Sequence, residues 1–291
     1  MKPKISIIGC GKVGTALAVF LSKAGYKIAG LSSKTIDSAR KTAKNSGSGT
    51  IFNNPEDAAK MGDIIFITTP DNIIEKICSN ITKKNILKKK TIIFHCSGAL
   101  SSKILISAIK KDLYTGSIHP LQSFAPYKKN QKSPFKGINI SIEGGKEARE
   151  KGKEIVNNLE AFFFTIPTKA KILYHTAAVV ASNYLVTLEN FALHLLYKAG
   201  LSENRAYEIL EPLIYGTLNN IKNRGIKNSL TGPIAREDIQ IVSSHIKDIN
   251  KYCPEFSPLY KLLGKHTLEI AQAKKKMDSK NIEQFLKMFQ S

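Results

Sequence analysis

The sequence contains few cysteines, and they are scattered. Cys10, Cys78, Cys96 and Cys253 form no Cys-x-x-Cys pair, and no group of histidines and cysteines has the spacing of a zinc site. We therefore expect neither a disulfide framework nor a bound metal.

Long uninterrupted apolar stretches are also missing. The most apolar one, residues 177–196, contains Asn183, Glu189, Asn190 and His194, which a membrane-spanning helix rarely carries. The first residues run directly into a short apolar stretch and a glycine turn, unlike a signal peptide. These features predict a cytoplasmic protein without a membrane partner.

Acidic residues are scarce, because 23 Asp and Glu face 44 Lys and Arg, for a formal net charge of +21. Such an excess can indicate a polyanionic partner such as nucleic acid, or it can follow from composition alone. The lysines are spread along the chain, and runs such as 88–90 and 274–276 carry no interleaved aromatic residues. We therefore expect no nucleic-acid partner, although a positive field would favour a phosphorylated cofactor and a carboxylate substrate.

With 291 residues, 42% of them apolar, the chain is long enough for two domains with cores of their own. Its first half alternates β-rich runs with helical patterns, and the continuous apolar character of the runs is typical of parallel strands covered on both faces. After Pro167 all segments look helical, so the sequence predicts domains at 1–167 and 168–291. The strands are expected at 4–9, 27–31, 63–68, 91–95, 114–118, 137–142 and 162–166, and the C-terminal helices at 170–199, 203–223, 233–250, 257–275 and 281–289.

A glycine motif, Gly9-Cys10-Gly11-Lys12-Val13-Gly14, directly follows the first strand and opens a helix. In this context Gly9 allows a tight turn, Gly11 lets the backbone approach a pyrophosphate, and Gly14 lets helix and strand pack closely. Free N–H groups at the helix N-terminus favour the phosphates. The motif predicts a dinucleotide cofactor and a fold of the α/β class, a Rossmann doubly wound parallel sheet followed by an all-α domain.

The end of the second predicted strand lacks the carboxylate that an NAD site uses to bind the ribose hydroxyl. Ser32, Ser33 and Lys34 stand there instead, with Arg40 further on, and these side chains suit a 2′-phosphate. We therefore predict NADP(H) as the cofactor, although an ordinary polar loop would look similar.

The third predicted strand ends at Thr68-Thr69-Pro70-Asp71 and the fourth at His95-Cys96-Ser97-Gly98. Both ends should lie at the carboxyl edge of the sheet, where ligands bind in such folds. The Gly-x-Ser-x-Gly pattern of a hydrolase is missing around Cys96 and Ser97, so neither is expected to be a nucleophile. The cofactor-binding residues predicted from all these segments are Gly9, Gly11, Lys12, Val13, Gly14, Ser32, Ser33, Lys34, Thr68, Thr69, Pro70 and Ser97.

A polar stripe begins just after the predicted domain boundary. Lys171, His175 and Ser182 would share one face of a helix, with Asn183 on its flank. Lys171, His175 and Asn183 are the candidate catalytic residues, because carbonyl reduction needs a proton from the protein as well as a hydride. The alternative is a satisfied core histidine beside an exposed lysine.

Further polar residues could bind a substrate. His119, Gln122 and Ser123 follow a predicted strand, and Arg236 lies in the first turns of a predicted helix, where it could clamp a carboxylate. Arg236 could equally be a surface charge near Asp238. With Ser182, these four residues form the predicted substrate site.

In combination these segments resemble a known family, which joins an N-terminal Rossmann-like domain to a helical C-terminal domain of formerly unknown function. The resemblance covers nearly the whole chain. The family itself is similar to a branch of the superfamily of 6-phosphogluconate dehydrogenase, β-hydroxyacid dehydrogenases, ketopantoate reductase and pyrroline-5-carboxylate reductase. The segments that carry it are 9–14, His95 to Leu100, His119 to Phe124, Tyr174 to Tyr184 and Leu230 to Arg236.

The resemblance implies a substrate bound between the domains, a homodimer formed through the helical domain, and NADPH-dependent reduction of a small 2-oxo acid. Its leading candidate is 2-dehydropantoate, as in the alternative ketopantoate reductases of pantothenate synthesis. Several relatives carry a lysine four residues before an asparagine, whereas here His175 follows Lys171 at that spacing, so either residue could donate the proton. Prephenate-type or imine reduction, and a non-catalytic NADP(H) sensor, are the alternatives.

Overall fold

The computed structural model describes residues 1–83 and 85–290. The chain forms two compact units, Met1–Val180 and Ala181–Ser291, which are described separately below. Ser291, the last residue of the predicted second domain, lies outside the described residues. The predicted boundary near residue 167 remains a prediction.

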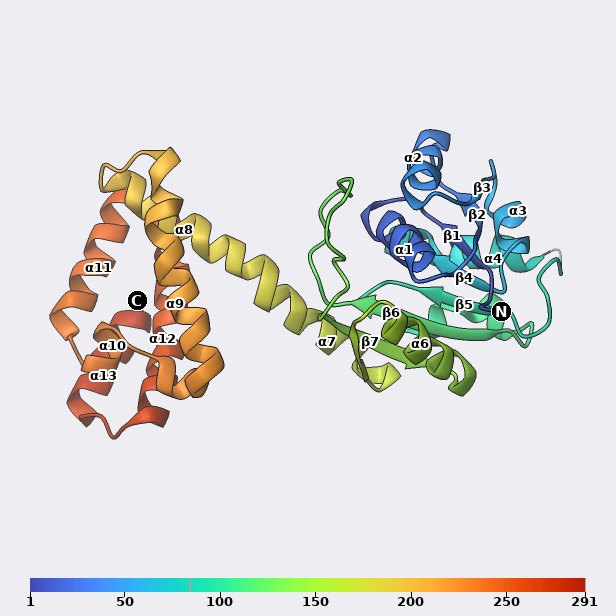
Figure 1. Ribbon diagram of the computed structural model, residues 1–291. Coiled ribbons are helices and arrows are strands. Elements are labelled where there is room, and N and C mark those ends of the chain that lie inside the picture. Colours follow the sequence, from blue (N-terminus) through green and yellow to red (C-terminus); the bar gives the residue numbers. More distant parts are fainter. Residues whose placement is uncertain (84, 291) are drawn as a thin grey trace. The chain divides into compact units, whose positions relative to one another are not determined.

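The first unit is built around an eight-stranded sheet with the order β3-β2-β1-β4-β5-β6-β7-β8 (Figure 1). All neighbouring strands are parallel except β6 and β7. The finding confirms the predicted fold class. The strands are β1 (Ile5–Ile8), β2 (Ile28–Ser32), β3 (Thr50–Ile51), β4 (Ile64–Ile67), β5 (Ile92–His95), β6 (Tyr114–Pro120), β7 (Asn139–Gly144) and β8 (Phe162–Thr165).

The antiparallel pair β6–β7 is the one exception to the parallel pairing of the sheet among the described residues. A parallel connection needs a crossover, usually a helix, to return the chain to the starting edge. The connection from β6 to β7, residues 121–138, contains no helix, so β7 runs back beside β6 and pairs Ser117 with Glu143. This register becomes important for the site.

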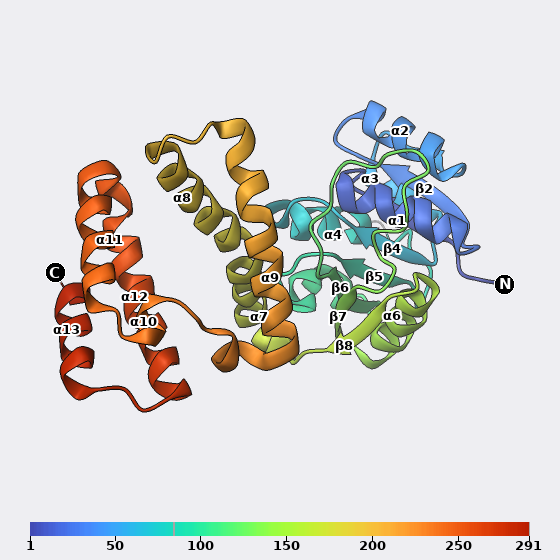
Figure 2. The same cartoon turned by 60° about the vertical axis from the view of Figure 1, so that its left-hand side comes forward.

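Helices cover both faces of the sheet, because side chains of a strand alternate between its two sides. Ile7 and Phe66 join a core with α1, α2 and α6, whereas Ile8 and Ile67 join a core with α3, α4 and α5 (Figure 2). These helices are α1 (Lys12–Lys23), α2 (Ile36–Ser46), α3 (Pro55–Lys60), α4 (Ile74–Lys83), α5 (Ile106–Ile109) and α6 (Lys146–Asn158), with 3-10 turns η1 (Asp71–Ile73), η2 (Ser102–Leu105) and η3 (Thr168–Ala170).

The predicted helix at 170–199 is interrupted by a π-helical turn at Val180–Tyr184, which separates α7 (Lys171–Val179) from α8 (Leu185–Lys198). The wider turn disturbs the 3.6-residue period on which the polar stripe was predicted, and such turns are frequent at functional sites. The first unit ends within this turn.

The second unit is helical, as predicted, and its core gathers Ile234, Val242, Leu268 and Phe285. Gly225, with φ of 73°, breaks the long α9. No helix in the described part of the chain is long and apolar enough to cross a membrane. Its remaining helices are α9 (Glu203–Ser229), α10 (Pro233–Arg236), α11 (Ile239–Tyr252), α12 (Ser257–Lys274) and α13 (Ser279–Gln290).

Candidate active site

The glycine motif has the backbone that a dinucleotide site requires. Gly9 has φ of +106°, and a Cβ there would lie 2.8 Å from the Thr68 carbonyl carbon. A Cβ on Gly14 would lie 1.9 Å from the Gly9 carbonyl oxygen, so only glycine lets α1 pack this closely on the turn. At Gly11 a Cβ would meet no atom within 4 Å and would instead occupy open space, where a pyrophosphate can approach the backbone.

A cavity of about 680 Å³ lies beside this turn. Its lining includes Gly9, Gly11, Ser32, Ser33 and Lys34 from the motif and the end of β2, as predicted. Thr68, Thr69 and Pro70 also line it, and the buried Thr69 hydroxyl finds no hydrogen-bond partner among the described residues. An unpaired polar atom in such a cavity fits a polar ligand that would satisfy it.

The end of β2 is arranged differently for each of its residues. Ser32 is buried, and its carbonyl accepts from the Gly9 N–H, whereas the Ser33 hydroxyl accepts from the Cys10 N–H. Lys34 is exposed at the cavity, and Arg40 pairs with Asp37 at 3.1 Å. Lys34 is therefore the cation best placed for a 2′-phosphate. The sequence reasoning missed Ser38 and Asn53, which also line the cavity.

Lys171, the first residue of α7, carries a buried ammonium group. Its side chain is only 2% exposed, and its Nζ donates to the Ser117 hydroxyl on β6 at 2.8 Å. Burial lowers the pKa of Lys171 to about 8, and the nearby carboxylates of Glu143 and Asp71 oppose this shift. The sequence could predict the lysine but not that its amine would lie beneath the carboxyl ends of β5 and β6.

Two histidines gather over Gly98. His119 accepts from or donates to the Tyr174 hydroxyl at 2.8 Å through Nδ1, and its ring meets His175 edge-on at 6.2 Å between centroids. A Cβ on Gly98 would lie 2.5 Å from His175 Nδ1 and 2.8 Å from His119 Nε2. Burial and the nearby charge of Lys171 lower the pKa of His119 to about 4, so this ring is neutral at pH 7. His175 Nδ1 is buried without a hydrogen-bond partner among the described residues.

Ser97 anchors the loop between β5 and η2. Its hydroxyl donates to Asp71 at 2.8 Å and accepts from the Ala99 and Leu100 N–H groups. The preceding Cys96 is held as a thiol, because burial raises its pKa to about 12.

Most of the remaining predicted residues are exposed within their own unit. Gln122 and Ser123 are exposed in the loop after β6, Lys12 and Val13 begin α1, and Arg236 is exposed and pairs with Asp238 at 2.9 Å. Ser182 and Asn183 are exposed in the π turn of the second unit. Among the described residues no group of side chains could hold a metal ion.

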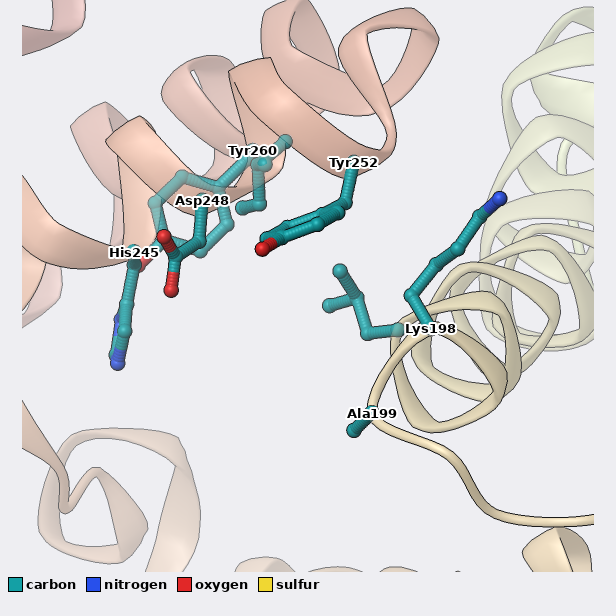
Figure 3. Close-up of a pocket in the computed structure, with 8 residues that line it drawn as sticks. Lys198, Ala199, His245, Asp248, Tyr252 and Tyr260 are labelled. Carbon is teal, nitrogen blue, oxygen red and sulfur yellow. The ribbon is translucent and has the colours of Figure 1, made fainter.

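The second unit has a groove of its own, of about 430 Å³, between the end of α8 and the helices α11 and α12 (Figure 3). Leu195 and Ile249 supply apolar lining, and the His245 ring is hydrogen-bonded to the Tyr260 hydroxyl at 2.8 Å. Figure 3 shows Lys198 across the groove from Tyr252 and Asp248.

The strand–turn–helix, its cavity and the buried lysine define a dinucleotide-binding α/β domain with a buried amine. Comparisons with known families agree with this class. Residues 4–109 match the model of a family described as NADP oxidoreductase, coenzyme F420-dependent, and residues 138–267 match that of a domain of unknown function, DUF2520. No curated protein matches the chain.

Solved structures show the same fold over nearly the whole length. A candidate NADP oxidoreductase from Bacteroides fragilis is 23% identical with a TM-score of 0.76, over 92% of this chain and 98% of that one. A Thermotoga maritima protein is 28% identical with a TM-score of 0.70, over 93% and 99%. An imine reductase from Myxococcus stipitatus, solved with NADP+, is 16% identical with a TM-score of 0.64, over 98% and 100%.

The chain is therefore an NADP-dependent oxidoreductase, as the glycine motif and the missing carboxylate predicted.

Proposed function

We propose that this chain uses NADPH to reduce a small 2-oxo acid, with 2-dehydropantoate as the first candidate, and that Lys171 protonates the forming alkoxide. The observation that carries the proposal is the Lys171 ammonium group, buried against Ser117 at the carboxyl edge of the sheet. A group with a pKa of about 8 is mostly protonated at pH 7 yet releases its proton far more readily than an exposed lysine.

The bound cofactor supplies the hydride, and the residues of this chain hold the reactants. Gly9, Gly11 and Thr69 would hold the dinucleotide, and Lys34 would hold its 2′-phosphate. The His175 Nδ1, which has no hydrogen-bond partner among the described residues, offers a second polar contact near Gly98. It would serve either the substrate or the Lys171 ammonium group. Ser123, Ser182, Asn183 and Arg236 remain proposed substrate residues, with Arg236 or Ser123 for the carboxylate. We also propose that the chain belongs to the superfamily of 6-phosphogluconate dehydrogenase and ketopantoate reductase.

Imine reduction is the second candidate, supported by the shared fold with the Myxococcus stipitatus imine reductase over 98% of this chain. A C=N substrate needs the same hydride and the same proton donor. The buried position of Lys171 speaks against a non-catalytic NADP(H) sensor, because such a protein would have no need for a desolvated ammonium group.

The test follows NADPH absorbance with a panel of 2-oxo acids and cyclic imines. We expect turnover with a 2-oxo acid, and a loss of about 10²-fold or more in kcat for Lys171→Met, as for removal of a general acid. Lys169→Met is the matched control, because Lys169 is exposed two residues earlier and should leave kcat unchanged. His175→Ala shows whether the histidine shares the role.

Turnover of imines alone would replace the leading substrate class. A Lys171→Met enzyme with normal kcat would refute the proposed proton donor, provided that the variant still binds NADPH, which its fluorescence reports.

We also propose that the chain forms a homodimer through its helical unit. Large apolar side chains there are strongly exposed, among them Val186 at 69%, Leu213 at 67% and Tyr215 at 62%. Exposed apolar surface of this extent commonly marks an interface between chains.

A further inference from the structure

Glu143, on β7, is a buried carboxylate that the sequence reasoning did not single out. It is only 1% exposed. Its Oε1 accepts from the Ser102 N–H, and its Oε2 accepts from the Ser102 hydroxyl at 2.9 Å and from the Thr168 hydroxyl at 3.0 Å. A carboxylate taken from water needs such partners, and it also favours a nearby positive charge.

The positive charge is supplied by Lys171, and the sheet register brings the two together. Glu143 on β7 is the direct cross-strand partner of Ser117 on β6. Residues paired in this way point their side chains to the same face of the sheet. Because the Lys171 Nζ donates to the Ser117 hydroxyl, the ammonium group is brought to the strand position that faces Glu143, and the carboxylate acts on the amine through its charge.

Glu143 also fixes the helix that carries the lysine. Thr168 belongs to η3, which leads directly into α7, and Ser102 begins η2, which follows the loop of Ser97 and Gly98. The two hydrogen-bonded hydroxyls therefore connect β7 to the start of α7 and to the loop beneath the histidines.

We propose that Glu143 is a positioning residue, which holds Lys171 against Ser117 and keeps its amine charged in a buried site. The inference rests on the proposed role of Lys171 as proton donor, but it concerns the state of the amine and not the identity of the substrate. Burial disfavours the charged amine, and Glu143 is the strongest of the groups that oppose this effect on the pKa of Lys171.

A purely structural role is the competing explanation. In that case Glu143 would only connect the three segments, and an uncharged side chain of the same shape would serve almost as well. Glu143→Gln separates the two, because the amide oxygen can still accept from Ser102 while the charge is lost.

The experiment titrates the Lys171 amine directly in the full chain, by NMR of isotope-labelled lysine, with the signal missing from Lys171→Met used for assignment. In Glu143→Gln we expect the pKa of Lys171 to fall by about 1 unit or more, the lower end of the effect of an adjacent opposite charge. Glu147→Gln removes the same charge from an exposed position four residues later and should leave the pKa unchanged. Glu143→Asp keeps the charge, so the pKa of Lys171 should stay close to its wild-type value.

The pH profile of kcat supplies the second measurement. The alkaline limb, where Lys171 loses its proton, should move to lower pH in Glu143→Gln and not in Glu147→Gln, while the Kd for NADPH stays within about twofold. Thr168→Val should lower kcat without moving this limb, since it loosens α7 but keeps the charge.

An unchanged Lys171 pKa in a folded Glu143→Gln variant would overturn the inference and leave the proposed function standing. A lowered pKa in a chain that reduces neither 2-oxo acids nor imines would support the inference and refute the proposed function. If Glu143→Gln fails to fold, Glu143→Ser takes its place in the titration: a fall of about 1 unit or more in the pKa of Lys171 is expected, and an unchanged pKa overturns the inference.

Discussion

Replacing Lys171 by methionine should make the protein more stable at neutral pH. The pKa of Lys171 falls from 10.5 to about 8 on folding, which corresponds to about 3 kcal/mol against the charged form. Methionine fills a similar volume without a charge, but it loses the hydrogen bond to Ser117, which is worth about 1 kcal/mol. We therefore expect a net gain of about 2 kcal/mol in the free energy of unfolding at pH 7.

The sign of the effect gives it a pH dependence. Below pH 8 the lysine is charged in both states and its full cost remains. Between pH 8 and pH 10.5 the folded amine is neutral while the unfolded one is still charged, so the unfolded state binds more protons and the wild-type protein gains stability as the pH rises. The advantage of Lys171→Met should therefore shrink over this range, and above it the variant should be less stable by the lost hydrogen bond, about 1 kcal/mol.

Urea unfolding followed by circular dichroism at pH 7, 8, 9 and 10 measures this difference. The exposed Lys169→Met control should stay within about 0.5 kcal/mol of wild type throughout. A Lys171→Met variant that is less stable than wild type at pH 7, or whose advantage does not change with pH, would show that the ammonium group is well solvated or fully compensated in the folded state.

Four further substitutions test three other parts of the structure. Gly11→Ala should leave the melting temperature within about 2 °C of wild type but weaken NADPH binding about tenfold or more, because its Cβ enters open space beside the turn. Gly14→Ala should instead destabilise the fold, because its Cβ would lie 1.9 Å from a carbonyl oxygen. Thermal melts and NADPH fluorescence compare the two variants, and equal behaviour would contradict the geometry. Lys34→Ala should weaken NADPH binding by about 10-fold while NADH binding is unchanged, as for loss of a charge-assisted hydrogen bond; an equal loss for both would remove Lys34 from the 2′-phosphate site. Leu213→Glu should convert the proposed dimer to a monomer in sedimentation experiments, whereas a wild-type chain that is already monomeric would refute the dimer.

Local patterns in the sequence were sufficient for the cofactor half of the molecule. The apolar strand, the glycine turn and the helix are consecutive in the chain, so their spacing alone predicts the turn that Gly9 and Gly14 form. The missing acid after β2 is a local signal in the same way. The two-residue β3 and the helices α4, α5 and α6 were missed. β3 and α5 are too short for a periodic pattern, and α6 has a highly polar sequence.

The catalytic half depends on contacts that no local pattern contains. Helical periodicity grouped Lys171 and His175 with Ser182 and Asn183, but the π turn from Val180 breaks that period. The partners that determine the chemistry of Lys171 come instead from β6, β7 and the loop after β4.

The antiparallel return of β7 explains why Glu143 was inconspicuous. In the sequence, Glu143 is one charged residue at the end of an apolar strand. If β7 ran parallel to β6, the carboxyl ends of the two strands would lie at the same edge of the sheet, and Glu143 would lie near the end of β6. The helix-free connection reverses the strand, so that the end of β7 pairs with the middle of β6, and Glu143 arrives beside Ser117. The charge of the proposed proton donor thus depends on a strand reversal, because any connection that kept β7 parallel to β6 would move this carboxylate away from Lys171.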